Sequence, residues 1–437
     1  MSTRELLRAS IAHTPANPFK ESQALQTFED GGLLIQDGRI LAVGSYHEIA
    51  AMAPEAAVTD WRGGFIVPGF VDAHVHFPQM RVIGSLGHSL FEWLARVALP
   101  EESRMADEAY ATDTAQRFVH HLAAHGTTTA LVFGAHFETA TAALFDAAAR
   151  AGLRIVSGLV LSDRSLRPEL HQSPEEAYQQ STRLIRRYHQ HGRLRYAVTP
   201  RFAVSASEGM LDVCQTLMRE HEHLGFQTHL NENSCEVTDV DRQFPWARDY
   251  FGVYERFGLC GPRAVMAHSV WTTAGELERL AASRTAVAHC PCSNAALGSG
   301  MFPLRPHIEA GVHVALGTDV GGGTGFSLLK EGLQAYLTQR LMPHGFGLTA
   351  AHVLYLATRA GAEALGLDDV GDFRSGQAAD FVYIRPGAHD VLGDVLARAG
   401  TLDQAVAAIF TLGGREHVRE VRVAGSVVFR SAFSDAR

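Results

Sequence analysis

The chain has 437 residues, of which 46% are hydrophobic and 19% are charged, and its mean hydropathy is -0.02. These values are typical of a globular enzyme and argue against a disordered or membrane-embedded protein. The formal net charge is -9 and no lysine and arginine run stands out, so we expect no nucleic-acid partner. No apolar segment of signal-peptide or membrane-spanning length is found, so we expect a cytoplasmic protein without a membrane partner.

The first predicted element is a β-hairpin over residues 32–44, where an Asp-Gly turn joins two apolar strands. Short β-rich runs then alternate with helical stretches, a pattern that predicts parallel strands joined by crossover helices. The predicted helices cover residues 113–124, 174–190, 206–224 and 274–283. The predicted strands cover residues 70–76, 127–133, 154–161, 195–199, 226–230, 264–268, 286–290 and 313–319.

Near the C-terminus, residues 380–384 and 421–429 again have a β pattern, the second with a glycine turn. Eight strand-helix units predict an α/β protein with a (β/α)8, TIM-like barrel. The β patterns at both ends predict a small β-sandwich domain built from the two termini. We therefore expect residues 1–67 and 371–437 in that domain and residues 68–370 in the barrel.

Candidate metal ligands follow from the ends of these strands, because the active site of such a barrel collects at the carboxyl ends. The first strand ends in His74 and His76, whose side chains point to the same face because they are two residues apart. The fifth, sixth and eighth runs end near His229, near His268 and at Asp319. One such histidine alone would more often be a core or surface residue, but their joint placement indicates a metal site.

Three histidines and one aspartate form a nitrogen-rich donor set that suits zinc or iron(II) rather than magnesium or calcium. No lysine occurs between Lys20 and Lys330, so the carbamylated lysine that would bridge two metal ions is not available. We therefore expect one metal ion per chain. Such an ion lowers the pKa of a bound water and makes a nucleophile for hydrolysis.

Two further positions are candidates for catalysis and binding. Glu232 follows His229 by three residues, and a carboxylate there can move protons between water and substrate. The alternative is a solvated loop glutamate. Arg201 and Phe202 close the fourth strand, where the guanidinium can bind a carbonyl oxygen or an anion. A surface arginine is nearly as good an interpretation from the spacing alone.

Several motifs make the sequence resemble the amidohydrolase superfamily, and within it the branch that deaminates guanine. The resemblance covers most of the chain. Its motifs are PGFVDAHVHFPQ (68–79), GTTTALVF (126–133), TPRFA (199–203), THLNEN (228–233), VMAHSV (265–270), HCPCSNAALGSGMF (289–302) and GTDVGGGTGFS (317–327).

The resemblance implies a role for each candidate residue. The metal ligands would be His74, His76, His229 and Asp319. Glu232 would shuttle protons together with Asp319, and His268 would hydrogen-bond the activated water or the developing intermediate, which refines its assignment from spacing. Substrate-binding residues, in addition to Glu232 and His268, would be Gln79, Arg201 and Phe202.

The implied reaction is hydrolytic deamination of guanine to xanthine and ammonia by a zinc-dependent or iron-dependent homodimer. Positions that depart from the branch pattern are expected at the pocket walls, and they leave open deamination of a related heterocycle such as 8-oxoguanine or a pterin. They are Leu86, residues 97–100, Ser165 and Val204. A non-catalytic scaffold with this fold is a further alternative, which stoichiometric metal would exclude.

Overall fold

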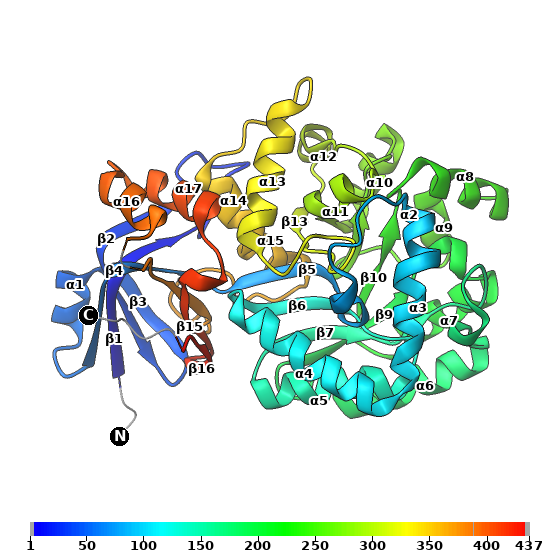
Figure 1. Ribbon diagram of the computed structural model, residues 1–437, viewed down its shortest axis with the longest axis horizontal. Helices are drawn as coiled ribbons and strands as arrows, with labels where there is room; N and C mark the ends of the chain where they lie inside the picture. Colours follow the sequence, from blue (N-terminus) through cyan, green and yellow to red (C-terminus); the bar gives the residue numbers. More distant parts are fainter. Residues whose placement is uncertain (1–3, 388, 433–437) are drawn as a thin grey trace.

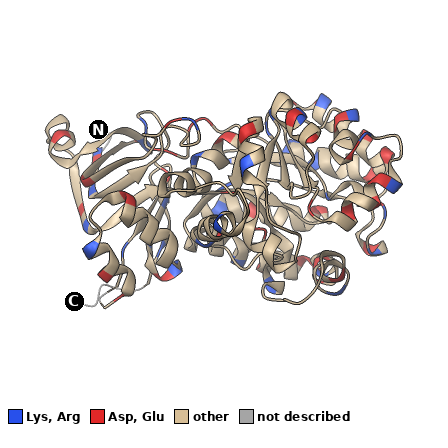
Figure 2. Cartoon of the chain, turned by 90° about the horizontal axis from the view of Figure 1, so that it is seen from above, with Lys and Arg blue, Asp and Glu red and all other residues tan. Residues whose placement is uncertain are grey.

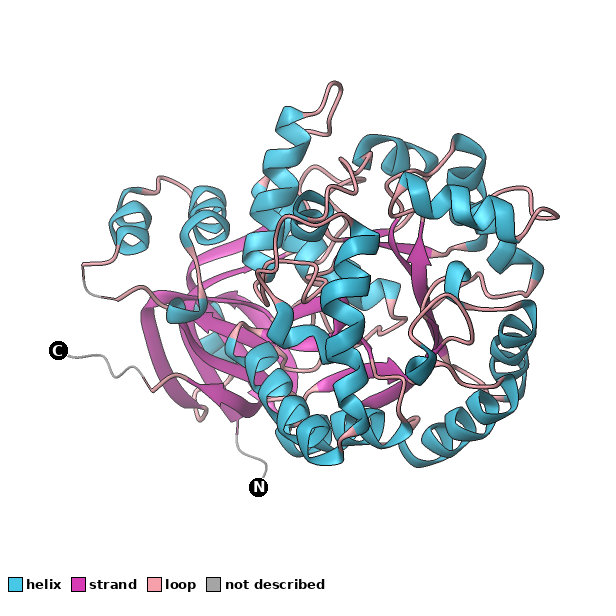
Figure 3. Ribbon diagram, turned by 45° about the vertical axis from the view of Figure 1, so that its right-hand side comes forward, coloured by secondary structure: helices cyan, strands magenta, loops and turns pink. Residues whose placement is uncertain are grey.

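The computed structural model describes residues 4–387 and 389–432, and it contains two β-sheets that lie beside each other (Figure 1). The larger sheet is built from the middle of the chain and the smaller one from its two ends. Helices surround the larger sheet (Figure 3). Among the described residues, none of the helices is both long and apolar enough to cross a membrane.

The larger sheet is a barrel whose parallel strands follow one another in chain order. Its strands are β5 (Phe70–His76), β6 (Thr127–Phe133), β7 (Arg154–Gly158), β9 (Leu194–Pro200), β10 (Gly225–Leu230), β11 (Ala264–His268), β12 (Ala286–His289) and β13 (Val314–Leu316), and β8 (Val160–Leu161) pairs with β9. The first and last strands meet where the Asp319 amide donates to the His74 carbonyl over 2.8 Å. The predicted (β/α)8 barrel is confirmed.

Two of the eight predicted strands differ from the structure by more than one residue at an end. The run 154–161 is divided into β7 and β8, because the Leu159 amide donates to the hydroxyl of Tyr196 over 3.2 Å instead of to a neighbouring strand. The last strand ends at Leu316 rather than at Asp319, because the Thr318 amide donates to the side chain of Asp72 over 3.0 Å. In both places a backbone amide donates to a side chain instead of to the backbone of a neighbouring strand.

The helices lie outside the barrel, and several have sequence-encoded starts. The Ser173 hydroxyl accepts from the Glu176 amide and Pro174 occupies the first turn of α6, an arrangement that satisfies amides left free at a helix start. The helix predicted from Asp113 begins earlier, since Asp107 caps it. The helices of the barrel are α4 (Glu108–Ala124), α5 (Glu138–Ala151), α6 (Pro174–Tyr188), α7 (Glu208–Glu220), α8 (Ser234–Gln243), α9 (Tyr250–Arg256), α10 (Ala274–Ser283), α11 (Pro291–Ala296), α12 (Leu304–Ala310), α13 (Leu328–Leu341), α14 (Ala350–Ala357) and α15 (Arg359–Ala364).

The smaller sheet combines strands from both ends of the chain in the order β16-β15-β14-β4-β1-β2-β3. A sandwich is predicted there, and hydrogen bonds join all seven strands into one continuous sheet, because the long strand β4 pairs with β1 on one side and with β14 on the other. Its strands are β1 (Arg4–His13), β2 (Gln26–Gln36), β3 (Arg39–Ser45), β4 (Ala57–Pro68), β14 (Phe381–Ile384), β15 (Val418–Val423) and β16 (Ser426–Arg430), accompanied by α1 (Tyr46–Met52), α16 (Val391–Arg398) and α17 (Leu402–Leu412).

The charged side chains are distributed over the outer helices with both signs mixed (Figure 2). A short capping segment follows β5 and consists of α2 (Leu90–Trp93), a π turn (Leu94–Ala98) and α3 (Leu99–Ser103). It packs at the end of the barrel where the polar strand ends gather. This end is the carboxyl end of the strands, which is where barrels of this class hold their active sites.

Candidate active site

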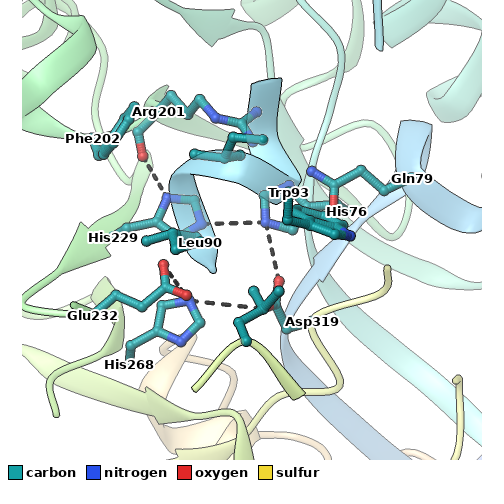
Figure 4. A pocket seen from close by; sticks show the side chains of 12 residues that line it. His76, Gln79, Leu90, Trp93, Arg201, Phe202, His229, Glu232, His268 and Asp319 are labelled. Carbon is teal, nitrogen blue, oxygen red and sulfur yellow. Dashed lines mark hydrogen bonds and ion pairs between the residues drawn. The ribbon is translucent and has the colours of Figure 1, made fainter. Parts of the chain in front are cut away.

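Four side chains converge at the carboxyl end of the barrel, and Figure 4 shows three of them, His76, His229 and Asp319. Strand β5 presents His74 and His76, whose Nε2 atoms lie 3.2 Å apart. The Nε2 atom of His229, from β10, lies 3.3 Å from that of His76. Asp319, after β13, places Oδ1 3.2 Å from His74 Nε2 and 3.3 Å from His76 Nε2. All four residues are buried.

These side chains fit a metal ion by spacing and by protonation state. Tetrahedral zinc with Zn–N distances of about 2.0–2.1 Å separates its ligand atoms by about 3.3–3.4 Å, close to the spacing above. The Nδ1 atom of His229 lies 2.6 Å from the Arg201 carbonyl, so Nδ1 carries the proton and Nε2 offers its lone pair. Burial lowers the pKa of His76 to about 4 and that of His229 well below its ordinary value. Both rings are therefore neutral, as ligation requires.

The carboxylate of Asp319 supplies the negative charge of this set. Burial raises its pKa, but hydrogen bonds and charge interactions with the histidines outweigh burial and hold the pKa well below its usual range. Three neutral imidazoles and one carboxylate form the donor set of a divalent zinc or iron ion rather than of magnesium. His268 can also approach His74 and His229 within 4.8 Å, but its Nε2 atom lies 3.8 Å from Asp319 Oδ2, farther than the other two partners of Asp319.

Glu232 and His268 form a second polar group beside this cluster. The Nε2 atom of His268 lies 3.5 Å from Glu232 Oε2, while its Nδ1 atom lies 2.9 Å from Asn294 Oδ1. The Asn294 oxygen can only accept, so Nδ1 carries the proton and Nε2 is free to accept one. Burial, and then the charge of Asp319, raise the pKa of Glu232 to about 8. A carboxyl group with a pKa near neutrality can both take up and release a proton at physiological pH.

Glu232 is held in place by its neighbours. Its backbone amide donates to Glu236 Oε2 over 2.9 Å, and the Ser299 hydroxyl donates to its Oε1 over 3.3 Å. His268 and Asp319 both have positive φ angles, 75° and 47°, which are uncommon for residues other than glycine. Backbone in this region often accompanies functional sites, where the surrounding structure holds a side chain in one direction.

A third group lies along the same cavity and contains Arg201, Gln79 and Phe202. The Nη1 atom of Arg201 donates to both oxygens of Glu102 over 2.8 Å. Gln79 donates from Nε2 to Glu102 Oε1 over 2.7 Å and accepts at Oε1 from the Gly321 amide over 3.1 Å. The structure thus brings together all of the sequence-predicted site residues around one cavity or directly beside it.

Several residues of the site carry no signal in the sequence. Leu90, Trp93 and Leu94 of the capping segment and Leu297 provide the apolar wall of the cavity. Apolar residues at helical spacing resemble ordinary core residues, so only the fold assigns them to the site. Glu102 lies beside the cavity and is 2% exposed; a buried glutamate needs a partner, and its partner Arg201 lies 99 residues away in the chain.

None of the positions that depart from the branch pattern is among the residues that line the cavity, contrary to the expectation that they touch its walls. Leu86 is 66% exposed at the surface, and Ser165 is also exposed. Val204 is buried, but it does not belong to the residues that line the cavity, and neither do residues 97–100. Proximity in sequence to a site residue therefore did not predict contact with the cavity.

Comparisons with known proteins agree with this geometry. The model of the amidohydrolase family matches residues 65–428, and a bacterial imidazolonepropionase-like composite domain matches residues 31–56. A protein from Deinococcus radiodurans described as a probable guanine deaminase is 56% identical over 432 residues, which cover 97% of this chain and 98% of that protein.

Two solved structures share the whole fold. The guanine deaminase from Bradyrhizobium japonicum superposes with a TM-score of 0.93 at 35% identity, over 98% of this chain and 100% of that one. The guanine deaminase from C. acetobutylicum with bound guanine in its active site has a TM-score of 0.91 at 25% identity, over the same shares of the two chains. With a family model matched over most of its length, the chain belongs to the amidohydrolase family.

Proposed function

We propose that this chain catalyses the hydrolytic deamination of guanine, with water as the second substrate and xanthine and ammonia as products. The observation that carries the proposal is one cavity that combines a metal-ligand cluster, an acid-base pair and hydrogen-bond donors beside an apolar wall. A flat, polar-edged base needs all of these features at once. A relative that is 56% identical is named a probable guanine deaminase and another that is 38% identical is named a guanine deaminase, and both names support the same assignment.

We further propose that His74, His76, His229 and Asp319 hold one zinc or iron(II) ion. When bound, the ion supplies a water of lowered pKa as the nucleophile. The chain's own residues then handle the protons. Glu232 takes a proton from the attacking water and delivers it to the ring nitrogen next to carbon 2, while Asp319 assists as its partner.

His268 is placed to hydrogen-bond the attacking oxygen through its free Nε2 atom, which lies between Glu232 and Asp319. After attack at carbon 2, the carbon–nitrogen bond to the exocyclic amino group breaks. Glu232, with Asp319 as its partner, takes the remaining proton from the new hydroxyl group on carbon 2 and passes it to the amino group, so that this group leaves as ammonia and the carbonyl of xanthine forms. The pKa of Glu232 near neutrality suits a residue that both accepts and donates in one turnover.

Arg201 is placed to donate to the purine carbonyl oxygen, with Gln79 and the backbone of Phe202 along the edge of the ring. Leu90 and Trp93 cover the faces of the base. A site that hydrogen-bonds polar groups strongly rejects analogues without them, because its buried donors would then remain unpaired.

The arrangement of the whole protein is part of the proposal. Residues 68–370 would form the catalytic barrel, and residues 1–67 and 371–437 the terminal domain. We propose a cytoplasmic homodimer that acts on a free purine base, without nucleic acid or membrane partners. The net charge of -9 supports the absence of a nucleic-acid partner.

The test is the metal-loaded protein with guanine, followed by ammonia release and xanthine formation, with metal content measured on each preparation. His76→Ala is expected to lower both bound metal and turnover, and Glu232→Gln to keep the metal and lower kcat by about 10²- to 10⁴-fold. His120→Ala, on an exposed position of α4, is the matched control and should retain full activity.

The same assay separates the alternatives. Turnover of 8-oxoguanine or a pterin in place of guanine would redirect the substrate assignment while preserving the mechanism. Absence of stoichiometric metal in the wild-type protein would contradict the catalytic assignment and favour a scaffold.

A further inference from the structure

Glu102 is a buried carboxylate that joins three elements of the site. It lies in α3 of the capping segment and contacts Arg201 from the end of β9, Gln79 from the turn after β5 and His136 from the loop after β6. The Arg201 and Gln79 contacts are 2.7–2.8 Å long, and His136 Nδ1 lies 3.4 Å from Glu102 Oε2. The proposed reaction does not use this carboxylate directly.

The contact between Glu102 and Arg201 determines the net charge on this side of the cavity. Burial raises the pKa of Glu102, but the charge of Arg201, the nearby histidines and the hydrogen bond from Gln79 together outweigh burial and lower the pKa below its usual value, so the carboxylate is ionised. Burial lowers the pKa of His136 to about 4, so this ring adds no positive charge. Arg201 and Glu102 are therefore one electrically neutral unit inside a dry site, where an unpaired charge would act strongly on any ligand.

The same contact sets the direction of the donors. Both oxygens of Glu102 accept from Nη1 of Arg201, which leaves Nε and Nη2 without a hydrogen-bond partner among residues 4–387 and 389–432. Because the guanidinium is planar and rigid, fixing one nitrogen fixes the direction of the others. Gln79 is oriented likewise, since its nitrogen faces Glu102 and its oxygen faces the Gly321 amide.

We propose that Glu102 is a positioning residue that aims the free donors of Arg201 into the cavity and cancels the arginine charge, so that the site selects an uncharged purine over an anionic one. This inference rests on the proposed function, because it assigns a selectivity to the same site. A neutral purine carbonyl needs only the free donors. An anionic purine would gain an ion pair if Glu102 did not already occupy the arginine.

The decisive experiment compares Glu102→Gln with wild type in the metal-loaded protein, using two purine probes. Urate is an anion at neutral pH and hypoxanthine is uncharged. Calorimetric titration gives their dissociation constants without requiring turnover. We expect Glu102→Gln to bind urate about tenfold more tightly than wild type, with hypoxanthine unchanged or weaker. Guanine turnover should fall by about 10²-fold in kcat/KM, since misplacement by about 1 Å can have that effect.

Glu101→Gln is the matched control. Glu101 is adjacent in the same helix and also buried, but it contacts Tyr110 and Arg104 rather than the cavity. It should leave the ratio of urate to hypoxanthine affinity unchanged. If Glu102 had a merely structural role, Glu102→Gln would weaken the binding of urate and hypoxanthine equally. The ratio of the two affinities would then be unchanged in both Glu102→Gln and Glu101→Gln.

Glu102→Asp separates charge from geometry and provides a second variant if Glu102→Gln does not fold. The shorter acid keeps the negative charge but no longer reaches Arg201 in the same way, so the urate to hypoxanthine ratio should stay at the wild-type value while kcat/KM falls. An unchanged ratio in Glu102→Gln, or an unchanged kcat/KM in Glu102→Asp, overturns the inference. Probes that bind wild type while guanine is not deaminated would contradict the proposed function alone, and wild type that binds neither probe would contradict both.

Discussion

The seam between the first and last barrel strands depends on one buried carboxylate, Asp72 of β5. Its Oδ1 atom accepts from the backbone amides of Thr318, over 3.0 Å, and of His74, over 3.2 Å. Its Oδ2 atom accepts from the Thr318 hydroxyl over 2.5 Å. The strands are close here, since a Cβ atom on Gly317 would lie 2.7 Å from that of His74. Asp72 therefore determines how His74 and Asp319 face each other.

Replacement of Asp72 by alanine should lower the free energy of unfolding by about 3–9 kcal/mol. The change leaves two backbone amides and one hydroxyl buried without partners, and each such group costs about 1–3 kcal/mol. Asp72→Asn should be nearly neutral, because its oxygen can accept from both amides while its nitrogen donates to the Thr318 hydroxyl. Asparagine also removes the penalty of burying a charge. Burial raises the pKa of Asp72 to about 7, although the hydrogen bonds from Thr318 and from the His74 amide lower it.

Urea unfolding of the metal-loaded variants, followed by far-ultraviolet circular dichroism, measures this difference, and elemental analysis measures bound metal. Asp72→Ala should also bind less metal, because three of the four proposed ligands, His74, His76 and Asp319, lie at this seam. Asp212→Ala, at an exposed position of α7, is the control and should change stability by less than about 0.5 kcal/mol. Equal stability of the alanine and asparagine variants would refute this account of the seam.

Two further predictions concern buried charges outside the site. Arg154→Met should destabilise the protein by about 3–5 kcal/mol in urea unfolding, because it leaves Asp380, 2.8 Å away in the terminal sheet region, buried without its cation. A loss below about 1 kcal/mol would contradict this prediction. Adding Asp380→Asn to the Arg154→Met variant should restore part of the lost stability. Glu331 is buried, and burial raises its pKa to about 8. Above about pH 4.5 the folded state therefore binds more protons than the unfolded state, so the stability of the wild-type protein should fall as the pH rises from about 4.5 to about 8. Glu331→Gln should remove that fall, by at most about 5 kcal/mol, and parallel stability profiles of the two proteins would argue against it.

The sequence by itself determined the barrel and its candidate metal ligands, because both depend on local patterns. Strands of a parallel barrel are short apolar runs separated by amphipathic helices, and these periodicities are visible along the chain. The ligands follow as well, since any residue that closes such a run lies at the carboxyl end of the barrel. The strand ends alone made His74, His76, His229, His268 and Asp319 candidates, and the resemblance to the amidohydrolase superfamily reduced the predicted ligands to the set without His268.

Only the tertiary structure decided how the substrate wall is built. Glu102 and Trp93 lie in a capping segment whose pattern resembles an ordinary helix, and their roles depend on Arg201 and on a cavity formed by distant strands. The sequence predicted a sandwich from the two termini, and only the structure shows one continuous sheet, because the pairing of β4 with both β1 and β14 joins segments far apart in the chain. Side-chain partners separated by tens or hundreds of residues leave no periodic signal, because packing in three dimensions, and not local propensity, selects them.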